Sequence, residues 1–268
     1  MPKATRERVS KGESTFLQSI KPISKPTDGM KIGFYGRSGT GKTRLLSTFP
    51  KPLLLILAEE GTRSIYKEKG VFVTPLVKDP NDLSRLAEHL RNNSKKYATV
   101  GLDTVTAFQD VVLRSIIQSD VPEQIGFGEV SREVWGECAL TMKERLREFF
   151  ELAALGINIV VNGQERDFNE EETTDILMPA VSFRVTPSVV DWLNPELDYI
   201  GHTFIKEETV KVVRMKGKQR VVLQKKMNKH CLRIGPNAMY VTKFRIPGTE
   251  LPDYIVDPHY SKLATLID

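Results

Sequence analysis

The sequence predicts an α/β fold in which a mostly parallel central sheet is flanked by helices and extended by antiparallel strands at its C-terminal edge. Three observations lead to this prediction. From Lys31 to about residue 162, apolar strand-like runs alternate with helix-like segments, as they do in parallel sheets. A glycine-rich loop, Gly36–Thr43, lies between the first apolar run and a helix-like run, which is the setting of the loop in P-loop NTPases. After residue 197 short alternating runs appear, and these are typical of antiparallel strands.

Each expected strand of the parallel sheet is a short apolar run, and each expected helix is a longer segment between two such runs. The expected strands are 31–35, 53–58, 71–74, 98–103 and 157–162. The expected helices are 42–49, 61–68, 80–93, 104–118 and 129–155. The runs that predict antiparallel strands are 198–205, 209–215, 220–226 and 238–245. Because the early strands are almost continuously apolar, we expect both faces of the sheet to be covered by helices.

The chain length of 268 residues suits one α/β domain with appendages. Residues 1–29 are polar and contain several Lys, Ser, Thr and Pro, so we expect a flexible basic arm. Its short apolar patch, Phe16 and Leu17 with Ile20, either docks on a neighbouring subunit or packs loosely. Residues 30–268 are expected to form the main domain, and 197–268 its antiparallel extension.

The composition predicts a cytoplasmic protein with a polyanionic partner. The net charge is +5 and the pI is about 9.1, which favours association with polyanions. Cys138 and Cys231 form no C-x-x-C pair and the four histidines show no ligand spacing, which argues against disulfides and structural zinc and favours a reducing cytosol. No run approaches the ~20 apolar residues that cross a bilayer, so we expect no membrane partner. The basic first residues precede no apolar stretch of a secretory signal.

The loop Gly36–Thr43 has the sequence GRSGTGKT and matches the G-x-x-x-x-G-K-[ST] pattern of a phosphate-binding loop. Its glycines allow positive φ angles, so successive backbone N–H groups can point at phosphate oxygens. Lys42 is expected to reach the β- and γ-phosphates and the Thr43 hydroxyl to reach Mg²⁺. The loop therefore predicts ATP and Mg²⁺ as cofactors. The expected nucleotide-binding residues are Gly36, Arg37, Ser38, Gly39, Thr40, Gly41, Lys42, Thr43 and Arg44.

Asp103 ends the expected strand 98–103 and is, with Thr43, the candidate ligand of Mg²⁺. At the carboxyl end of a strand beside the phosphate loop it would hold the ion directly or through water. The alternative is that Asp103 caps the helix that begins near Thr104. Because Thr104 is not a carboxylate, the Asp-Glu pair of AAA+ enzymes is absent, and the catalytic base must come from another strand.

The catalytic base is expected after the strand 53–58, where Glu59 and Glu60 follow the apolar run. A carboxylate at this strand end can reach a water in line with the γ-phosphate. Glu59 is preferred and Glu60 is the substitute. The alternative is that both are solvated acids at the start of a helix, where the helix dipole favours them.

Gln164 follows the strand 157–162 and is the candidate sensor of the γ-phosphate or of the attacking water. The alternative is an ordinary amide at a strand end. The segment 165–190 has no clear core pattern and contains Arg166 and Arg184. Long irregular loops of this kind are usually functional.

Two regions are candidates for nucleic-acid binding. The expected strands after residue 205 carry many cations, which form either a track for a phosphate backbone or a solvated basic edge. In the region 119–135, aromatic residues beside a cation can stack on bases, although Trp135 also suits a helix core. The residues of the first region are Lys206, Lys211, Arg214, Lys216, Lys218, Arg220, Lys225, Lys226 and Lys229, and those of the second are Phe127, Arg132 and Trp135.

Taken together, the motifs resemble the core of RecA-type recombinases. More narrowly, residues 30–268 resemble the short phage RecA-like single-strand annealing recombinases. The shared order of motifs is the phosphate loop, Ala58-Glu59, Asp103 and Val161-Asn162-Gly163-Gln164. The further shared segments are Leu57 to Ser64, Leu197 to Gly201 and the tail from Thr242 to Ile255.

The resemblance implies catalytic roles for residues besides Lys42. Glu59 matches the catalytic glutamate, and Gln164 matches the glutamine that couples the nucleotide state to a DNA-binding loop. Lys243 and Arg245 occupy the place of a basic pair that reaches the nucleotide of the adjacent subunit, where a cation neutralises charge on the γ-phosphate. The alternative for this pair is two solvent-facing cations on an edge strand.

Two features depart from the RecA pattern. Gly163 separates Asn162 from Gln164, which puts the reach of Gln164 in doubt. The extra domains of full-length RecA are also missing, which fits annealing better than strand exchange.

The leading hypothesis is a DNA-dependent ATPase of phage recombination that binds single-stranded DNA and promotes annealing. It would assemble head to tail into a ring or filament with ATP between subunits, and a single-strand-binding protein is a further candidate partner. The second hypothesis is an ATPase that acts on a protein, such as a helicase loader or a DNA-packaging accessory factor. A small-molecule kinase is disfavoured because no arginine-rich lid is evident. GTP is disfavoured because Asn228-Lys229-His230-Cys231 lacks the aspartate that reads guanine.

Overall fold

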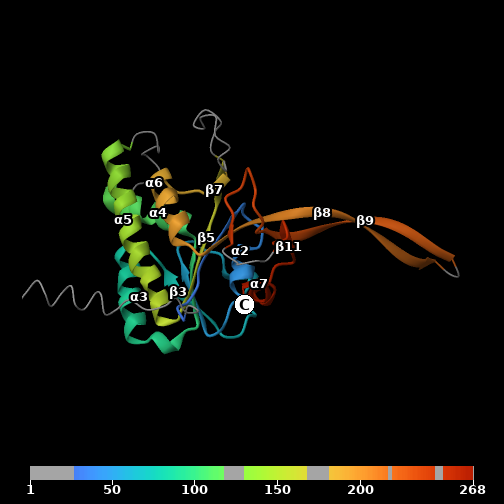
Figure 1. Ribbon diagram of the computed structural model, residues 1–268, viewed down its shortest axis with the longest axis horizontal. Coiled ribbons are helices and arrows are strands. Elements are labelled where there is room, and N and C mark those ends of the chain that lie inside the picture. Colours follow the sequence, from blue (N-terminus) through green and yellow to red (C-terminus); the bar gives the residue numbers. More distant parts are fainter. Residues whose placement is uncertain (1–26, 118–129, 168–180, 217–218, 245–249, 268) are drawn as a thin grey trace, which may run out of the picture.

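In the computed structural model, a mixed β-sheet is covered by helices on both faces (Figure 1). The structure describes residues 27–117, 130–167, 181–216, 219–244 and 250–267, without the side chains of 210–225. The expected arm therefore lies outside the described residues, apart from 27–29. The division of the chain at residue 29 stays a prediction.

The strands of the main sheet follow the order β11-β9-β8-β1-β5-β4-β2-β3, and β10 pairs with β8. Strands β1 to β5 pair in parallel and β8 joins β1 in parallel, whereas β9, β10 and β11 are antiparallel additions. A separate antiparallel pair is formed by β6 and β7. The bounds are β1 Lys31–Gly36, β2 Leu53–Leu57, β3 Val71–Leu76, β4 Thr99–Asp103, β5 Asn158–Gly163, β6 Glu165–Asp167, β7 Val181–Phe183, β8 Tyr199–Lys216, β9 Gln219–Arg233, β10 Lys243–Phe244 and β11 Tyr254–Val256. This topology confirms the fold class that the sequence predicts.

Strand β2 shows why the central strands are apolar throughout. Leu54 and Ile56 join the core on one face of the sheet, and Leu53 and Leu55 join the core on the other. Successive side chains of a strand point to opposite faces of the sheet. In a strand that helices cover on both faces, every side chain is therefore buried and apolar residues are favoured at each position. Burying each such side chain stabilises the fold by roughly 1.5–3 kcal/mol.

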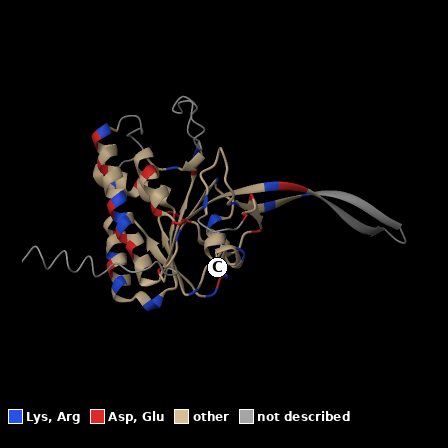
Figure 2. Ribbon diagram, viewed as in Figure 1, with Lys and Arg blue, Asp and Glu red and all other residues tan. Residues whose placement is uncertain are grey.

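The helices divide between the two faces of the sheet (Figure 1). Helices α3, α4, α5 and α6 pack on one face, and α2 and α7 on the other. Lys and Arg alternate with Asp and Glu along α5 (Figure 2), while its buried face is apolar. None of the described helices is both long and apolar enough to cross a membrane. The bounds are α2 Lys42–Leu46, α3 Asn81–Asn92, α4 Val105–Ile117, α5 Arg132–Phe150, α6 Pro187–Glu196 and α7 Tyr260–Ile267.

Several expected helices differ from those observed. The expected helix 61–68 is only the short 3₁₀ turn Thr62–Ser64, because Ile65 is buried there while Tyr66 is 76% exposed, and no apolar face forms. The expected helix 129–155 ends as an α-helix at Phe150 and continues as the 3₁₀ turn Glu151–Leu155. Helices α6 and α7 were not expected.

The expected strands 198–205 and 209–215 are one continuous strand, β8, whose register with β9 runs from His202↔Arg233 to Lys216↔Gln219. The resulting β8–β9 hairpin projects from the body of the molecule (Figure 1). Of the expected strand 238–245, which the structure describes up to residue 244, only Lys243–Phe244 is a strand.

Candidate nucleotide-binding site

The phosphate loop joins β1 to α2 and depends on glycine at its two ends. Gly36 has a φ of 155° and Gly41 a φ of 96°, values that side chains of other residues rarely allow. A Cβ atom on Gly36 would lie 2.3 Å from the Thr203 carbonyl oxygen. The loop therefore curls tightly against β8, and its last two residues, Lys42 and Thr43, already belong to α2.

Lys42 is 6% exposed and its ammonium group lies inside the loop. Its Nζ donates to the carbonyl oxygens of Gly36 and Arg37 at 2.8 and 2.9 Å. Burial lowers the pKa of Lys42, and the charges of Asp103 and Glu59 oppose this shift. A phosphate bound in the loop would add a further negative charge beside Lys42. Like the charges of Asp103 and Glu59, it would favour the protonated ammonium.

Asp103 is the meeting point of the loop and the end of β5. Thr43 Oγ1 donates to Asp103 Oδ2 at 2.7 Å, and Asn162 Nδ2 donates to Asp103 Oδ1 at 3.0 Å. The helix after Asp103 has another partner at its first turn, because the Ala107 N–H donates to Thr104 Oγ1 at 3.2 Å. The hydroxyl of Thr43 and the carboxylate of Asp103 thus lie together, as an oxygen-ligated cation would need.

Asp103 reaches the loop from a strand that is not the direct neighbour of β1, because β5 lies between β4 and β1. The parallel register places Asp103 opposite Asn162 on β5, and the Asp103 side chain still reaches Thr43.

Glu59 follows β2 and lines a cavity that it shares with the phosphate loop. The N–H groups of Ala58 and Glu59 donate to the Asp103 carbonyl oxygen at 2.9 and 3.4 Å, which ties the end of β2 to the end of β4. Burial, and then the charge of Asp103, raise the pKa of Glu59, while a hydrogen bond with Thr104 and the charge of Lys42 oppose the rise. Glu60 also lines the cavity but is exposed.

Gln164 lies between this cavity and the β6–β7 pair. Its side chain lines the cavity. Its N–H donates to Thr106 Oγ1 at 3.0 Å, and its carbonyl oxygen accepts from the Arg184 N–H at 2.8 Å. Gly163 before it is required by packing, because a Cβ there would lie 2.5 Å from the Phe183 ring.

The cavity that these residues share has a volume of about 420 Å³, within the range of small-molecule sites. It brings together residues of the loop, the ends of β2, β4 and β5, and one residue of β9. Its lining residues are Ser38, Gly39, Gly41, Lys42, Thr43, Arg44, Glu59, Glu60, Gly61, Ser64, Asp103, Thr104, Gln164 and His230.

The root of the β8–β9 hairpin contacts the phosphate loop at Thr40, a link that the sequence did not reveal. Thr40 Oγ1 and Thr203 Oγ1 are 2.7 Å apart, and His230 Nδ1 is 3.0 Å from the Thr40 carbonyl oxygen. Because a carbonyl oxygen only accepts, Nδ1 of His230 carries the hydrogen. Thr203 belongs to β8 and His230 to β9, so both strands of the hairpin hold the loop.

Glu165 makes a further connection between the loop and β8. Its carboxylate accepts from Arg37 Nε at 2.7 Å and from His202 Nε2 at 2.9 Å. His202 is 3% exposed and stacks on Tyr240 with ring centroids 4.1 Å apart. Burial lowers the pKa of His202, and the hydrogen bond and charge of Glu165 oppose this. The one sequence signal for Glu165 is its place directly after Gln164.

Lys243 does not lie at the cavity of its own chain. Its Nζ donates to the carbonyl oxygens of Asn194 at 2.9 Å and Pro195 at 3.0 Å, and also to that of Leu197, at the end of α6. Arg245 lies outside the described residues. A role for this pair at a neighbouring subunit stays a prediction.

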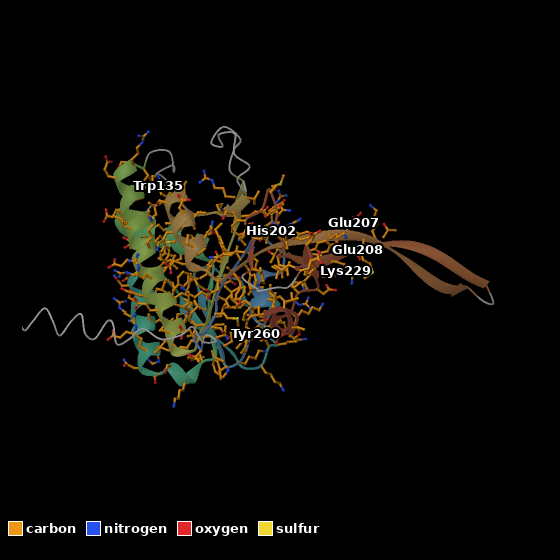
Figure 3. All side chains as sticks on the ribbon, viewed as in Figure 1. Trp135, His202, Glu207, Glu208, Lys229 and Tyr260 are labelled. Carbon is orange, nitrogen blue, oxygen red and sulfur yellow. The ribbon has the colours of Figure 1, made fainter. Side chains whose placement is uncertain are left out.

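The two candidate nucleic-acid regions are described in part. In the hairpin, Lys226 pairs with Glu207 at 2.7 Å and Lys229 with Asp257 at 3.4 Å, while the side chains of 210–225 and residue 127 lie outside the described part. Trp135 belongs to α5 and packs partly against the core (Figure 3). It also lines a cavity of about 520 Å³ together with Arg166 and Arg184.

Comparisons with known proteins place the chain in a family. Residues 28–246 match the family described as AAA domain, whereas no curated protein matches significantly. Solved structures that match include the flagellar accessory protein FlaH from Methanocaldococcus jannaschii, with 12% identity, coverage of 85% of this chain and 84% of that chain, and a TM-score of 0.41. A KaiC-like protein from Pyrococcus horikoshii OT3 matches with 11% identity, coverage of 86% and 91%, and a TM-score of 0.43. Similarities this distant carry no functional argument. Because the family match spans most of the sequence, the chain belongs to the AAA domain family of P-loop ATPases.

Proposed function

We propose that the chain is a Mg²⁺-dependent ATPase that couples hydrolysis to the binding of single-stranded DNA and promotes strand annealing in phage recombination. The observation that carries the ATPase part is the convergence of Lys42, Thr43, Asp103 and Glu59 on one cavity. These four groups are the parts that phosphoryl transfer to water requires: a cation for the phosphates, two oxygen ligands for a metal and a base.

The oxygen atoms at the cavity fit Mg²⁺. Thr43 Oγ1 and Asp103 Oδ2 are 2.7 Å apart, and Mg²⁺ is usually held by one or two protein oxygens together with phosphates and waters. Among the described residues no group of three or more His, Cys, Asp and Glu forms a metal cluster. When bound, Mg²⁺ would neutralise charge on the β- and γ-phosphates.

In this mechanism Glu59 takes a proton from the attacking water. Its raised pKa makes the carboxylate a stronger base than an exposed glutamate. Lys42 holds the γ-phosphate and stabilises the charge that develops on it. Gln164, at the edge of the cavity, exchanges hydrogen bonds with the γ-phosphate or the water.

Coupling to DNA is supported by the link at Thr40. The loop is hydrogen-bonded to both strands of the β8–β9 hairpin through Thr203 and His230. A change in the loop on nucleotide binding therefore acts on the root of the element that carries the densest run of Lys and Arg in the sequence. The cavity of Trp135, Arg166 and Arg184 supports a second contact, since an aromatic ring beside cations suits a nucleobase next to a phosphate.

The proposal includes assembly of several copies with ATP between subunits, through Lys243 and Arg245. For Lys243 to reach a neighbouring nucleotide, its ammonium must leave the carbonyl oxygens at the end of α6. We therefore expect assembly to be accompanied by a rearrangement at this point, not by docking of a rigid surface.

The experiment is to measure ATP turnover with and without single-stranded DNA, and DNA affinity over a range of salt concentrations. The proposal expects DNA to stimulate turnover and affinity to fall steeply with salt, because cations on the protein displace counterions from phosphates. Turnover that DNA leaves unchanged would overturn the DNA part and favour an ATPase that acts on a protein partner.

A variant of Thr203 tests the coupling itself. Thr203→Val removes the hydroxyl that meets Thr40, and we expect ATP binding to persist while stimulation by DNA falls. Thr99→Val is the matched control, because it is also a buried strand threonine, with its hydroxyl on the Pro50 carbonyl at 2.8 Å. Equal loss of stimulation in both variants would indicate general destabilisation instead of coupling.

A further inference from the structure

A second cavity adjoins the phosphate cavity at the start of α2. Its volume is about 610 Å³. Gly41, Arg44 and His230 line both cavities, so the second is the direct continuation of the first. Thr40 of the phosphate loop lines the second cavity as well.

The chemistry of the second cavity changes along its length. At the shared border, Arg44 offers N–H groups and His230 offers Nε2, the ring nitrogen that does not bond Thr40. Leu45 and Phe49, which are 2% and 1% exposed, form an apolar floor. Asp257 lies in the segment between β11 and α7 and contributes a carboxylate.

The structure fixes Asp257 relative to the loop. The Asp257 N–H donates to the His230 carbonyl oxygen at 2.7 Å, and His230 in turn holds the loop through Thr40. Asp257 has a positive φ of 45°. Within the described residues, its carboxylate pairs with Lys229 through Oδ2, at 3.4 Å and with 58% of the aspartate side chain exposed. The carboxylate therefore retains capacity to accept further hydrogen bonds.

A second phosphate site is a poor fit for this cavity. Two acids, Glu68 and Asp257, line it, and Glu68 pairs with Lys51 at 3.1 Å. An additional anion would face these carboxylates. A neutral group with a flat apolar surface and hydrogen-bond donors would instead match both the floor and Asp257.

We propose that the second cavity is the nucleoside subsite, in which Asp257 accepts a hydrogen bond from a ribose hydroxyl or from the amino group of the base. The triphosphate then lies in the loop, and the sugar passes Arg44 and His230. This inference rests on the proposed nucleotide binding at the loop and specifies the part of the ligand that the loop leaves unrecognised.

The test compares ATP with inorganic tripolyphosphate, each with Mg²⁺, by calorimetric titration of the full chain and of Asp257→Asn. Asparagine tolerates a positive φ, so the variant keeps its backbone. On charge alone, removing an acid strengthens the binding of any polyphosphate. The proposal expects the opposite for ATP, a weakening of about tenfold, with tripolyphosphate unchanged or slightly tighter.

The matched control is Asp253→Asn, an exposed aspartate at the other end of β11 that does not line the cavity. It should bind both ligands as the wild type does. Equal changes for ATP and tripolyphosphate in Asp257→Asn would overturn the nucleoside subsite. Failure of the wild type to bind either ligand would overturn nucleotide binding itself, so the two failures are distinguishable.

Two analogues identify the donor. The 2′-deoxy form of ATP lacks one ribose hydroxyl, and inosine triphosphate lacks the amino group of the base. One of these groups donates the hydrogen bond to Asp257. Its loss weakens binding to the wild type about tenfold but changes binding to Asp257→Asn little. If both analogues, and also the 3′-deoxy form of ATP, bind the wild type as tightly as ATP does, the role of Asp257 is overturned.

Discussion

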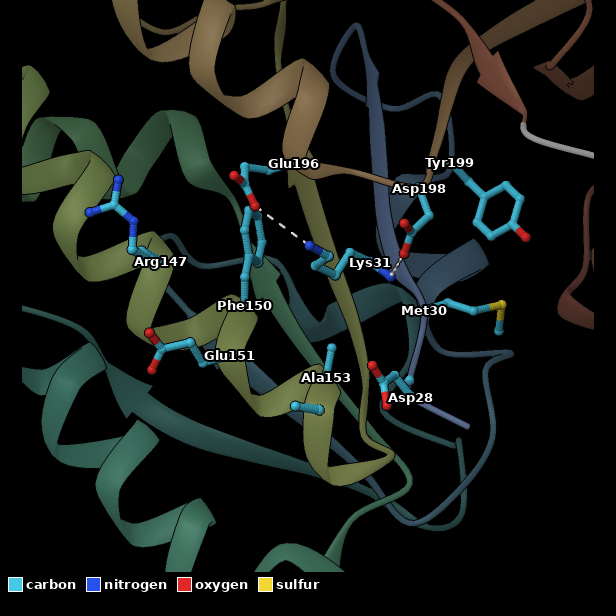
Figure 4. A pocket seen from close by; sticks show the side chains of 12 residues that line it. Asp28, Met30, Lys31, Arg147, Phe150, Glu151, Ala153, Glu196, Asp198 and Tyr199 are labelled. Carbon is cyan, nitrogen blue, oxygen red and sulfur yellow. Dashed lines mark hydrogen bonds and ion pairs between the residues drawn. The ribbon is translucent and has the colours of Figure 1, made fainter. Parts of the chain in front are cut away.

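The two ends of the central sheet each carry a cavity, and the two differ in how their charged groups are held. At the carboxyl ends of the strands, the cavity of about 420 Å³ contains Lys42, Asp103 and Glu59. At the amino ends, a cavity of about 580 Å³ contains Lys31 and Glu196 (Figure 4). There Lys31 Nζ lies 3.5 Å from Glu196 Oε2, and both groups are partly exposed.

The difference shows that cavity size does not mark the functional site. At the amino end the charges form an ordinary ion pair near the surface, which contributes little to stability. At the carboxyl end burial lowers the pKa of Lys42 and raises that of Glu59. Ionisable groups with shifted pKa values cluster at functional sites. The smaller cavity is therefore the stronger candidate for the functional site.

The largest expected effect comes from Lys42→Ala. Loss of the ammonium removes charge-assisted hydrogen bonds to the phosphates, and we expect ATP affinity to fall by about two orders of magnitude or more. Calorimetric titration with ATP and Mg²⁺ measures this. The matched control is Lys78→Ala, because Lys78 is an exposed lysine that does not line the cavity. Unchanged ATP affinity in Lys42→Ala would contradict the assignment of the carboxyl-end cavity as the nucleotide site.

Glu59→Gln is expected to separate binding from hydrolysis. The amide keeps the shape of the side chain but cannot take a proton, so kcat should fall about 10²- to 10⁴-fold while ATP affinity changes little. Glu60→Gln is the matched control, since Glu60 is the exposed neighbour at the same cavity. If Glu60→Gln loses activity and Glu59→Gln does not, the base is Glu60.

The pH dependence of turnover sharpens the assignment of the base. Glu59 must be ionised to act, and burial beside Asp103 raises its pKa. Turnover should therefore fall, as the pH is lowered, at a higher pH than for an exposed glutamate. The rate profile of kcat against pH measures this limb, and the residual activity of Glu59→Gln should not show it.

The residues of the carboxyl-end cavity were predictable because each signal is local. Glu59, Asp103 and Gln164 are polar residues at or just after the ends of apolar strands, and parallel strands end at one edge of a sheet. The order of the strands is not local, so the sequence did not show that β5 lies between β1 and β4. Local sequence patterns thus identified the residues of the cavity but not the order of the strands that carry them.

The contacts that link the loop to the hairpin were not predictable in this way. His230 and Thr40 are 190 residues apart in the sequence, and no spacing rule connects them. Helix α6 was missed for a different reason, because Pro187 was assigned to an irregular segment although proline suits the first turn of a helix. The expected helix 61–68 failed because it had polarity without an apolar face.

The smallest expected effect comes from a substitution in the amino-end cavity. It tests whether the charged pair there is unimportant for the nucleotide site. Glu196→Gln removes the partner of Lys31 while keeping its shape. Because both side chains are partly exposed, we expect the free energy of unfolding to change by less than about 0.5 kcal/mol and ATP turnover to stay at the wild-type value. Chemical denaturation and a turnover assay measure the two quantities. A several-fold loss of turnover at unchanged stability would mean that the amino end of the sheet also controls the nucleotide site, and the two cavities would then have to be regarded as coupled.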